Sequence, residues 1–127
     1  MNWLPRNPPR AFRVGPRADI ELKDCGRVEL DPDEQVTFAT SSGAEYDVAA
    51  KSWGFYATPS VNGRLASFGF GTALVRSADA KRFVLLVERT RRAEFEAYLA
   101  ENGLTVVVWL DDDRVLEAID GLAGDRP

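Results

Sequence analysis

Residues 19–50 have the sequence DIELKDCGRVELDPDEQVTFATSSGAEYDVAA, in which apolar side chains recur at every second position over much of the stretch. Such alternation is typical of β-strands with one face in the core and one in solvent. Turn-forming residues interrupt it at residues 24–26, 31–33 and 41–43. The stretch therefore predicts two successive β-hairpins, one over residues 20–30 and one over residues 36–50.

The rest of the chain predicts four more strands and two helices. Strands are expected at residues 53–58, 65–76, 83–87 and 104–110. The last two are almost wholly apolar, which favours the centre of a sheet. One helix is expected at residues 91–102, with Thr90 as N-cap and Gly103 at C′, and another from the Asp111-Asp112-Asp113 run to Leu122. The strand–helix–strand order favours a crossover between two parallel strands.

These elements predict an α+β fold: an antiparallel, β-rich meander of about 7–9 strands, barrel-like or strongly curved, with two C-terminal helices packed on it. A length of 127 residues suits one domain. We expect a basic, Pro- and Arg-rich arm over residues 1–17 and a single α+β domain over residues 18–124. The apolar residues Trp3, Leu4 and Phe12 are expected to pin the arm to the body or to a second copy.

Composition excludes several classes of chemistry. The chain has no histidine, so serine or cysteine catalysis with a histidine base is excluded. Its single cysteine, Cys25, has no intramolecular disulfide partner, which is typical of a reducing compartment. No apolar run approaches the roughly 20 residues that span a bilayer. We expect a cytoplasmic protein without a membrane partner, a bound cofactor or a metal site.

Charge is divided unevenly along the chain. The formal net charge is −4, and because the arm carries four arginines and no acid, the remaining residues carry −8. An acidic body repels phosphate backbones, so no nucleic-acid partner is expected, and the arm is expected to lie on its own acidic body. Arginine outnumbers lysine 13 to 3. This bias is common in GC-rich bacterial genomes and indicates a bacterial source.

Residues 51–71 concentrate aromatic, hydroxyl and glycine residues and are the main candidate for a binding groove. Asn62-Gly63 predicts a two-residue hairpin turn, which would place Tyr56 beside Gly69 and Gly54 beside Gly71. A shallow floor of small residues beside aromatic rings would suit a flat or sugar-like ligand. The predicted ligand-binding residues are Trp53, Tyr56, Thr58, Ser60, Asn62, Arg64, Gly69 and Gly71.

A structural explanation of the same residues stays open. Glycine in strands often marks bulges or close backbone approach, so Gly69 and Gly71 are also explained by twist and packing alone. Pro59 conflicts with the hairpin register, because it would stand where a ladder N–H is needed. A longer loop would remove the conflict, and a slip of one residue would exchange the two faces.

The leading hypothesis is a non-catalytic binding or assembly module that binds a second copy of itself, as a homodimer, or a small polar ligand. The alternative is a small histidine-free enzyme acting on a sugar-like or phosphorylated metabolite, with Glu45, Asp47, Tyr56 and Arg64 as its polar groups. A third hypothesis places magnesium-assisted chemistry on the run of residues 111–113. Aspartates at a helix start are explained more simply by capping.

Overall fold

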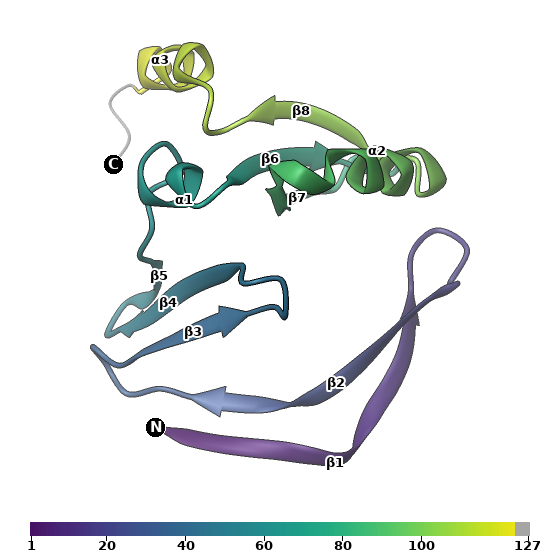
Figure 1. Ribbon diagram of the computed structural model, residues 1–127, viewed down its shortest axis with the longest axis vertical. Coiled ribbons are helices and arrows are strands. Elements are labelled where there is room, and N and C mark those ends of the chain that lie inside the picture. The colour runs from purple at the N-terminus through teal and green to yellow at the C-terminus, as the bar shows by residue number, and fades with distance from the viewer. Residues whose placement is uncertain (124–127) are drawn as a thin grey trace. The chain divides into compact units, whose positions relative to one another are not determined.

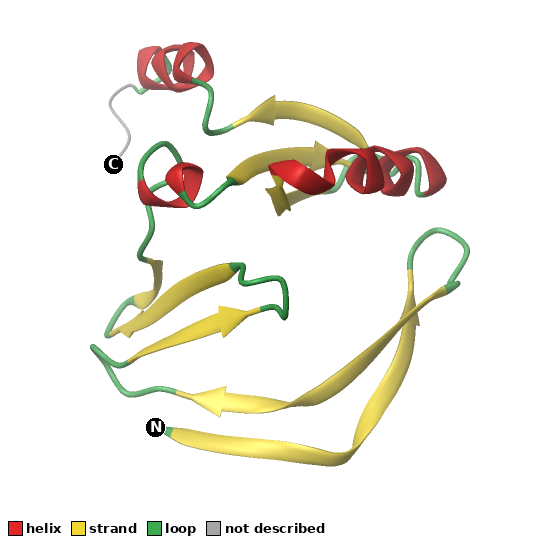
Figure 2. Cartoon of the chain, in the orientation of Figure 1, coloured by secondary structure: helices red, strands yellow, loops and turns green. Residues whose placement is uncertain are grey.

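The computed structural model describes residues 1–123, and the chain divides into two units, residues 1–58 and residues from 59 onward. The described residues contain eight strands in three small antiparallel sheets, with helices only from Arg64 onward (Figures 1 and 2). The predicted α+β class and its antiparallel, β-rich character are confirmed, and none of the three sheets in the described part of the chain closes into a barrel. Residue 124, the predicted end of the domain, lies outside the described residues.

The first sheet is a two-stranded ribbon of β1 (Asn2–Val14) and β2 (Ile20–Glu29), which pair antiparallel. Residues 2–14 of the predicted arm therefore form a strand, and the division of the chain into an arm and one domain stays a prediction. Two of the three prolines of β1, Pro8 and Pro9, lie in residues 6–9, where the pairing with β2 is interrupted, so their missing N–H donors cost no ladder hydrogen bond.

The predicted hairpin over residues 20–30 is wrong, because residues 24–26 lie inside β2 and form no turn. They lie at a β-bulge instead, where the register of the ribbon shifts between Pro5 and Arg10. Gly26 has a φ of +150°, and a Cβ there would come within 2.5 Å of the Trp3 ring. Gly26, which the sequence pattern placed in a turn, thus allows the Trp3 ring to pack directly against the backbone.

The second sheet is formed by β3 (Gln35–Ala39), β4 (Glu45–Lys51) and β5 (Gly54–Ala57), in that order and all antiparallel. The predicted hairpin over residues 36–50 is confirmed. Its turn contains Gly43 at φ +92°, a conformation that glycine adopts without strain. Thr40 also closes the turn, since its N–H donates to the Ala44 carbonyl over 3.0 Å.

The second unit contains α1 (Arg64–Ser67), β6 (Phe70–Arg76), β7 (Arg82–Glu88), the 3-10 turn η1 (Arg89–Arg91), α2 (Arg92–Glu101), β8 (Thr105–Trp109) and α3 (Asp113–Gly121). Its sheet has the order β7-β6-β8. Both outer strands are antiparallel to β6, so they run in the same direction, as the predicted crossover requires. They are not neighbours, however, because β6 lies between them.

The central strand is β6, and the expectation that residues 83–87 and 104–110 occupy the centre is wrong. Five of the seven residues of β6 are buried, including Ala73 and Val75. The edge strands are apolar because helix α2 adjoins the sheet on the side of Trp109, where Phe95 meets the Trp109 ring edge-on at 5.8 Å. On the opposite side of the same sheet, Val84 stays 61% exposed.

The helix ends follow the predicted rules in part. Gly103 has a φ of +62° at the C′ position of α2, as expected. Thr90 is not the N-cap, because it lies inside η1 and Arg91 takes that position without a side-chain cap. At the last helix, Ile119 of α3 and Leu122, which follows it, are both exposed, so neither takes part in the expected packing of this helix. None of the described helices is long and apolar enough to cross a membrane.

Candidate functional site

The eight residues predicted to bind a ligand fall in both units of the chain. Three lie at or next to β5 in the first unit, and five lie around α1 and the start of β6 in the second. The pairs expected to bring them together do not form, because Tyr56 pairs with Ala49 and Gly54 with Lys51, both on β4. The predicted hairpin is therefore wrong. Ligand binding by Trp53, Tyr56, Thr58, Ser60, Asn62, Arg64, Gly69 and Gly71 stays a prediction.

Asn62-Gly63 leads into helix α1 instead of a hairpin. The N–H groups of Gly63 and Leu65 both donate to the Ser60 carbonyl, over 3.3 and 3.1 Å, and so begin a helical turn. Leu65, 1% exposed, anchors this turn in the core. The signal for this outcome was Pro59, whose missing donor already conflicted with the hairpin register.

The space above Gly71 is filled by the indole ring of Trp109. A Cβ at position 71 would lie 2.8 Å from the ring, which is closer than side chains pack. The same indole also contacts Arg92, whose guanidinium lies over the ring at 4.6 Å from its centroid. Packing against Trp109 therefore explains why residue 71 is glycine. The open surface of small residues expected beneath a ligand is absent at this position.

The sheet β3-β4-β5 has one apolar and one polar side. Its register places the following residues on one side, here named the apolar face: Val36, Phe38, Tyr46, Val48, Ala50, Phe55 and Ala57. Ala50 is buried, but Phe38 is 56% and Phe55 74% exposed. Burial raises the pKa of Tyr46, because the apolar surroundings disfavour the phenolate. The apolar face thus has a partly buried centre and two exposed aromatic rings.

The opposite side of this sheet, the polar face, carries hydroxyl and carboxylate groups. The Thr37 hydroxyl donates to the Asp47 carboxylate over 2.6 Å, and the Thr58 N–H donates to the Asp47 carbonyl over 3.1 Å. Glu45 and Tyr56 share this face by register. The sheet thus brings together three of the four polar residues of the enzyme hypothesis, whereas Arg64 belongs to the other unit.

Asp111 joins the ends of two strands in the second unit. Its Oδ1 accepts the Thr72 N–H at 2.9 Å, and its Oδ2 lies 3.5 Å from the Arg89 guanidinium. The side chain is only 16% exposed. Arg89 also donates to the Ala66 carbonyl over 2.9 Å, so the cluster ties α1, β6 and β8 together. This arrangement is a structural clamp, which sequence reasoning missed because its partners lie far apart along the chain.

Asp112 caps helix α3, as the simpler explanation of the aspartate run requires. Its Oδ1 accepts the N–H groups of Arg114 and Val115, over 2.8 and 3.4 Å. Within residues 1–123, no three Asp, Glu, Cys or His side chains come together in a way that could hold a metal ion. The roles of Asp111 and Asp112 are thus accounted for by hydrogen bonding to backbone N–H groups.

Two of the three arginines of β1 lie close to one acid of β2. Asp24 Oδ2 lies 3.0 Å from Arg6 Nε and 3.6 Å from Arg10 Nη2. The same side chain accepts the Gly26 N–H over 3.2 Å, so it holds the bulge in place. The Asp24 carboxylate therefore offsets part of the basic charge of this segment within the first unit.

Comparison with known protein families, curated proteins and solved structures finds no match to this chain.

Proposed function

We propose that the chain is a non-catalytic binding or assembly module whose docking surface is the apolar face of β3-β4-β5. The observation that carries the proposal is the exposure of Phe38 and Phe55 on one side of one sheet. Contiguous exposed apolar patches on folded proteins mark interaction sites. Aromatic residues are enriched in such sites. Within this proposal the module works in the cytoplasm, where Cys25 stays reduced.

The chemistry of the face favours an amphipathic helix of a partner protein as the occupant. The only hydrogen-bonding side chain on it is the Tyr46 phenol, so a small polar ligand would leave its own polar groups unpaired. Three strands spaced about 4.8 Å apart present a strip roughly 10 Å wide. That width suits one helix with its side chains, which is about 10–12 Å across.

Binding of the fluorescent dye anilinonaphthalene sulfonate, whose aromatic rings bind to exposed apolar surface, tests whether this face takes up apolar groups. The wild-type chain is expected to bind the dye with a rise in fluorescence, because exposed apolar surface does so. The double variant Phe38→Ser/Phe55→Ser should lose most of that signal. Leu122→Ser is the matched control, since Leu122 is 82% exposed but lies at the end of α3. An unchanged signal in the double variant would remove the face as the binding site.

A second proposal is a small histidine-free enzyme acting on a sugar-like or phosphorylated metabolite. It is favoured by Asp47, Glu45 and Tyr56 sharing the polar face. Nitrophenyl glycosides and nitrophenyl phosphate are suitable probes, with Asp47→Asn as the variant that keeps the shape and loses the charge. Release of nitrophenol by the wild type that Asp47→Asn abolishes would support the enzyme. Equal rates in the two chains would end it.

A further inference from the structure

Strand β7 is an edge of its sheet, and it pairs only with β6 among the described strands. The ends of the β6–β7 hairpin show which backbone groups face outward. Ser77 N–H donates to the Lys81 carbonyl, and Arg89 N–H donates to the Gly69 carbonyl, each over 2.9 Å. Hydrogen-bonded pairs alternate along an antiparallel ladder. The odd-numbered residues of β7 therefore bond to β6, and the even-numbered ones direct their N–H and C=O groups to the open side.

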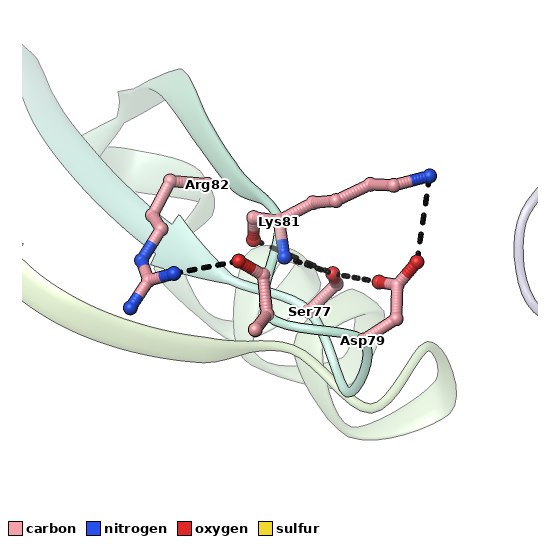
Figure 3. A network of polar contacts seen from close by, with 5 residues as sticks. Ser77, Asp79, Lys81 and Arg82 are labelled. Carbon is pink, nitrogen blue, oxygen red and sulfur yellow. Dashed lines mark hydrogen bonds and ion pairs between the residues drawn. The ribbon is translucent and has the colours of Figure 1, made fainter.

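The turn between β6 and β7 is held by its own polar contacts (Figure 3). The Ser77 hydroxyl donates to the Asp79 carboxylate and accepts the Lys81 N–H over 3.1 Å. The Asp79 carboxylate also lies 3.4 Å from the Lys81 ammonium. Arg82 Nη1 donates to the Ala80 carbonyl over 2.6 Å. These contacts fix the hairpin register and place Arg82 at the start of the open edge.

The sequence of β7, RFVLLVE, is complementary to itself in the antiparallel direction. If two copies pair about Leu85, each Arg82 lies opposite Glu88 of the second copy. The five apolar residues between them then meet only apolar residues, and Val84, 61% exposed, gains an apolar neighbour. A shift of the two-fold axis by one residue would place each charge opposite an apolar or small residue. Charge and hydropathy therefore select one register.

The charges near Arg82 within the second unit also favour pairing of β7 with a second copy. The cross-strand neighbour of Arg82 on β6 is Arg76, and like charges directly opposite each other are destabilising. Across residues 1–123, neither arginine has a carboxylate within ion-pair distance. Glu88 lies 3.7 Å from Arg91, and a carboxylate accepts several donors at once. A second copy would supply the acid that Arg82 lacks.

We propose that the chain forms a two-fold symmetric dimer in which β7 pairs antiparallel with β7 of a second copy about Leu85. The two three-stranded sheets then become one sheet of six strands, closed by a self-complementary contact. The long edges of β1, β2 and β8 are less suited to such pairing, since β1 contains Pro5, Pro8 and Pro9, and the ladders of β2 and β8 are interrupted by register shifts. All residues of this contact belong to the second unit, whereas the apolar face belongs to the first, so the two proposals are tested independently.

Charge reversal with analytical ultracentrifugation tests this dimer. The wild type is expected to sediment with an apparent mass twice the 14.0 kDa of one chain and to dissociate on dilution. Arg82→Glu and Glu88→Arg should each raise the dimer dissociation constant about tenfold or more, because like charges then face each other. The double variant Arg82→Glu/Glu88→Arg should restore the wild-type value. Arg114→Glu, on α3, makes the same change in charge away from the edge and should have no effect.

Three results of this experiment would overturn the proposal. The first is a wild type that stays monomeric at every concentration up to about 1 mM. The second is a dimer whose dissociation constant is unchanged by the single charge reversals, and the third is a double variant that dimerises no better than the single variants. A far-ultraviolet circular dichroism spectrum of each variant separates loss of pairing from loss of folding.

A cysteine cross-link tests the register without changing charge. In the proposed dimer Leu85 faces Leu85 of the second copy in a non-hydrogen-bonded pair, where Cα atoms are about 4.5 Å apart and a disulfide fits. In a Cys25→Ser background, Leu85→Cys should therefore form a covalent dimer with oxidised glutathione. Phe83→Cys is the control, because its two copies would lie about 13 Å apart. Equal cross-linking of both variants, or of neither, would contradict the register.

Discussion

Gly71 lies beneath the indole ring of Trp109, and this contact leaves no room for a side chain at position 71. Gly71→Ala is therefore expected to push the ring away from Arg92 and Phe95 and to lower the free energy of unfolding by about 1–3 kcal/mol. Urea unfolding followed by tryptophan fluorescence measures this loss.

Gly121→Ala is the matched control for that substitution. Gly121 is the last residue of α3, and the position that its Cβ would take has open space around it, so a methyl group fits freely. Since alanine favours a helix over glycine by about 1 kcal/mol at most, this variant should be unchanged or slightly stabilised. An equal effect of the two substitutions would show that the Trp109 contact does not constrain position 71.

Asp111 matters because its carboxylate receives a buried backbone donor. Asp111→Ala leaves the Thr72 N–H without a partner and should cost about 1–3 kcal/mol of unfolding free energy. Asp111→Asn keeps an oxygen for that N–H and loses only the attraction to the exposed Arg89, which is expected to cost about 1 kcal/mol or less. Equal losses from the two variants, measured by urea unfolding, would contradict the clamp.

Burial of Tyr46 makes the free energy of unfolding depend on pH in the alkaline range. Its pKa in the folded chain is raised above the ordinary value of 10.0 by burial, so the folded chain holds the phenolic proton more tightly than the unfolded chain does. This stabilisation is complete below pH 10 and is lost as pH rises from there through the folded pKa. Tyr46→Phe should remove that part of the loss. Urea unfolding midpoints between pH 9 and about 11 measure it, and parallel curves for the two chains would contradict it.

Helix α3 depends on its first residues, because its apolar side chains are only partly buried. Asp112→Ala removes the acceptor of the Arg114 and Val115 N–H groups and should cost about 0.5–2 kcal/mol. Asp112→Asn keeps the acceptor and should retain most of the stability. Helix content from circular dichroism and the unfolding free energy measure the effect. If Asp112→Asn lowers the unfolding free energy as much as Asp112→Ala does, the effect comes from the lost charge and not from lost capping.

Elements were predictable where the pattern is local. The alternation of Val36 and Phe38 with Tyr46 and Val48, around a turn with Gly43, sufficed for the β3–β4 hairpin. Local signals failed where a distant contact decides the conformation. Gly26 marks a bulge beneath Trp3, and Gly63 precedes a helical turn anchored by Leu65, so neither serves the turn that its neighbours suggested.

At the scale of the whole molecule, the α+β class followed from the order of the patterns, but the arrangement of the sheets did not. Strand β6 occupies the centre of its sheet, and its small residues Gly71 and Ala73 leave room for the Trp109 ring on one face, which composition alone does not reveal. The predicted hairpin around Asn62-Gly63 was wrong because it required residues of β5 and β6 to pair, and these strands belong to different sheets.

The proposed docking surface is the apolar face of β3-β4-β5, which can bind a partner only if it is exposed in the folded chain. Phe55, 74% exposed, and Phe70, 7% exposed, are two phenylalanines of β-strands with opposite predicted behaviour. The most direct test compares the unfolding free energies of Phe55→Ala and Phe70→Ala. We predict a change within about 0.5 kcal/mol for Phe55→Ala and a loss of about 3–5 kcal/mol for Phe70→Ala. A loss from Phe55→Ala as large as that from Phe70→Ala would mean that the face is core and would contradict its role as a docking surface.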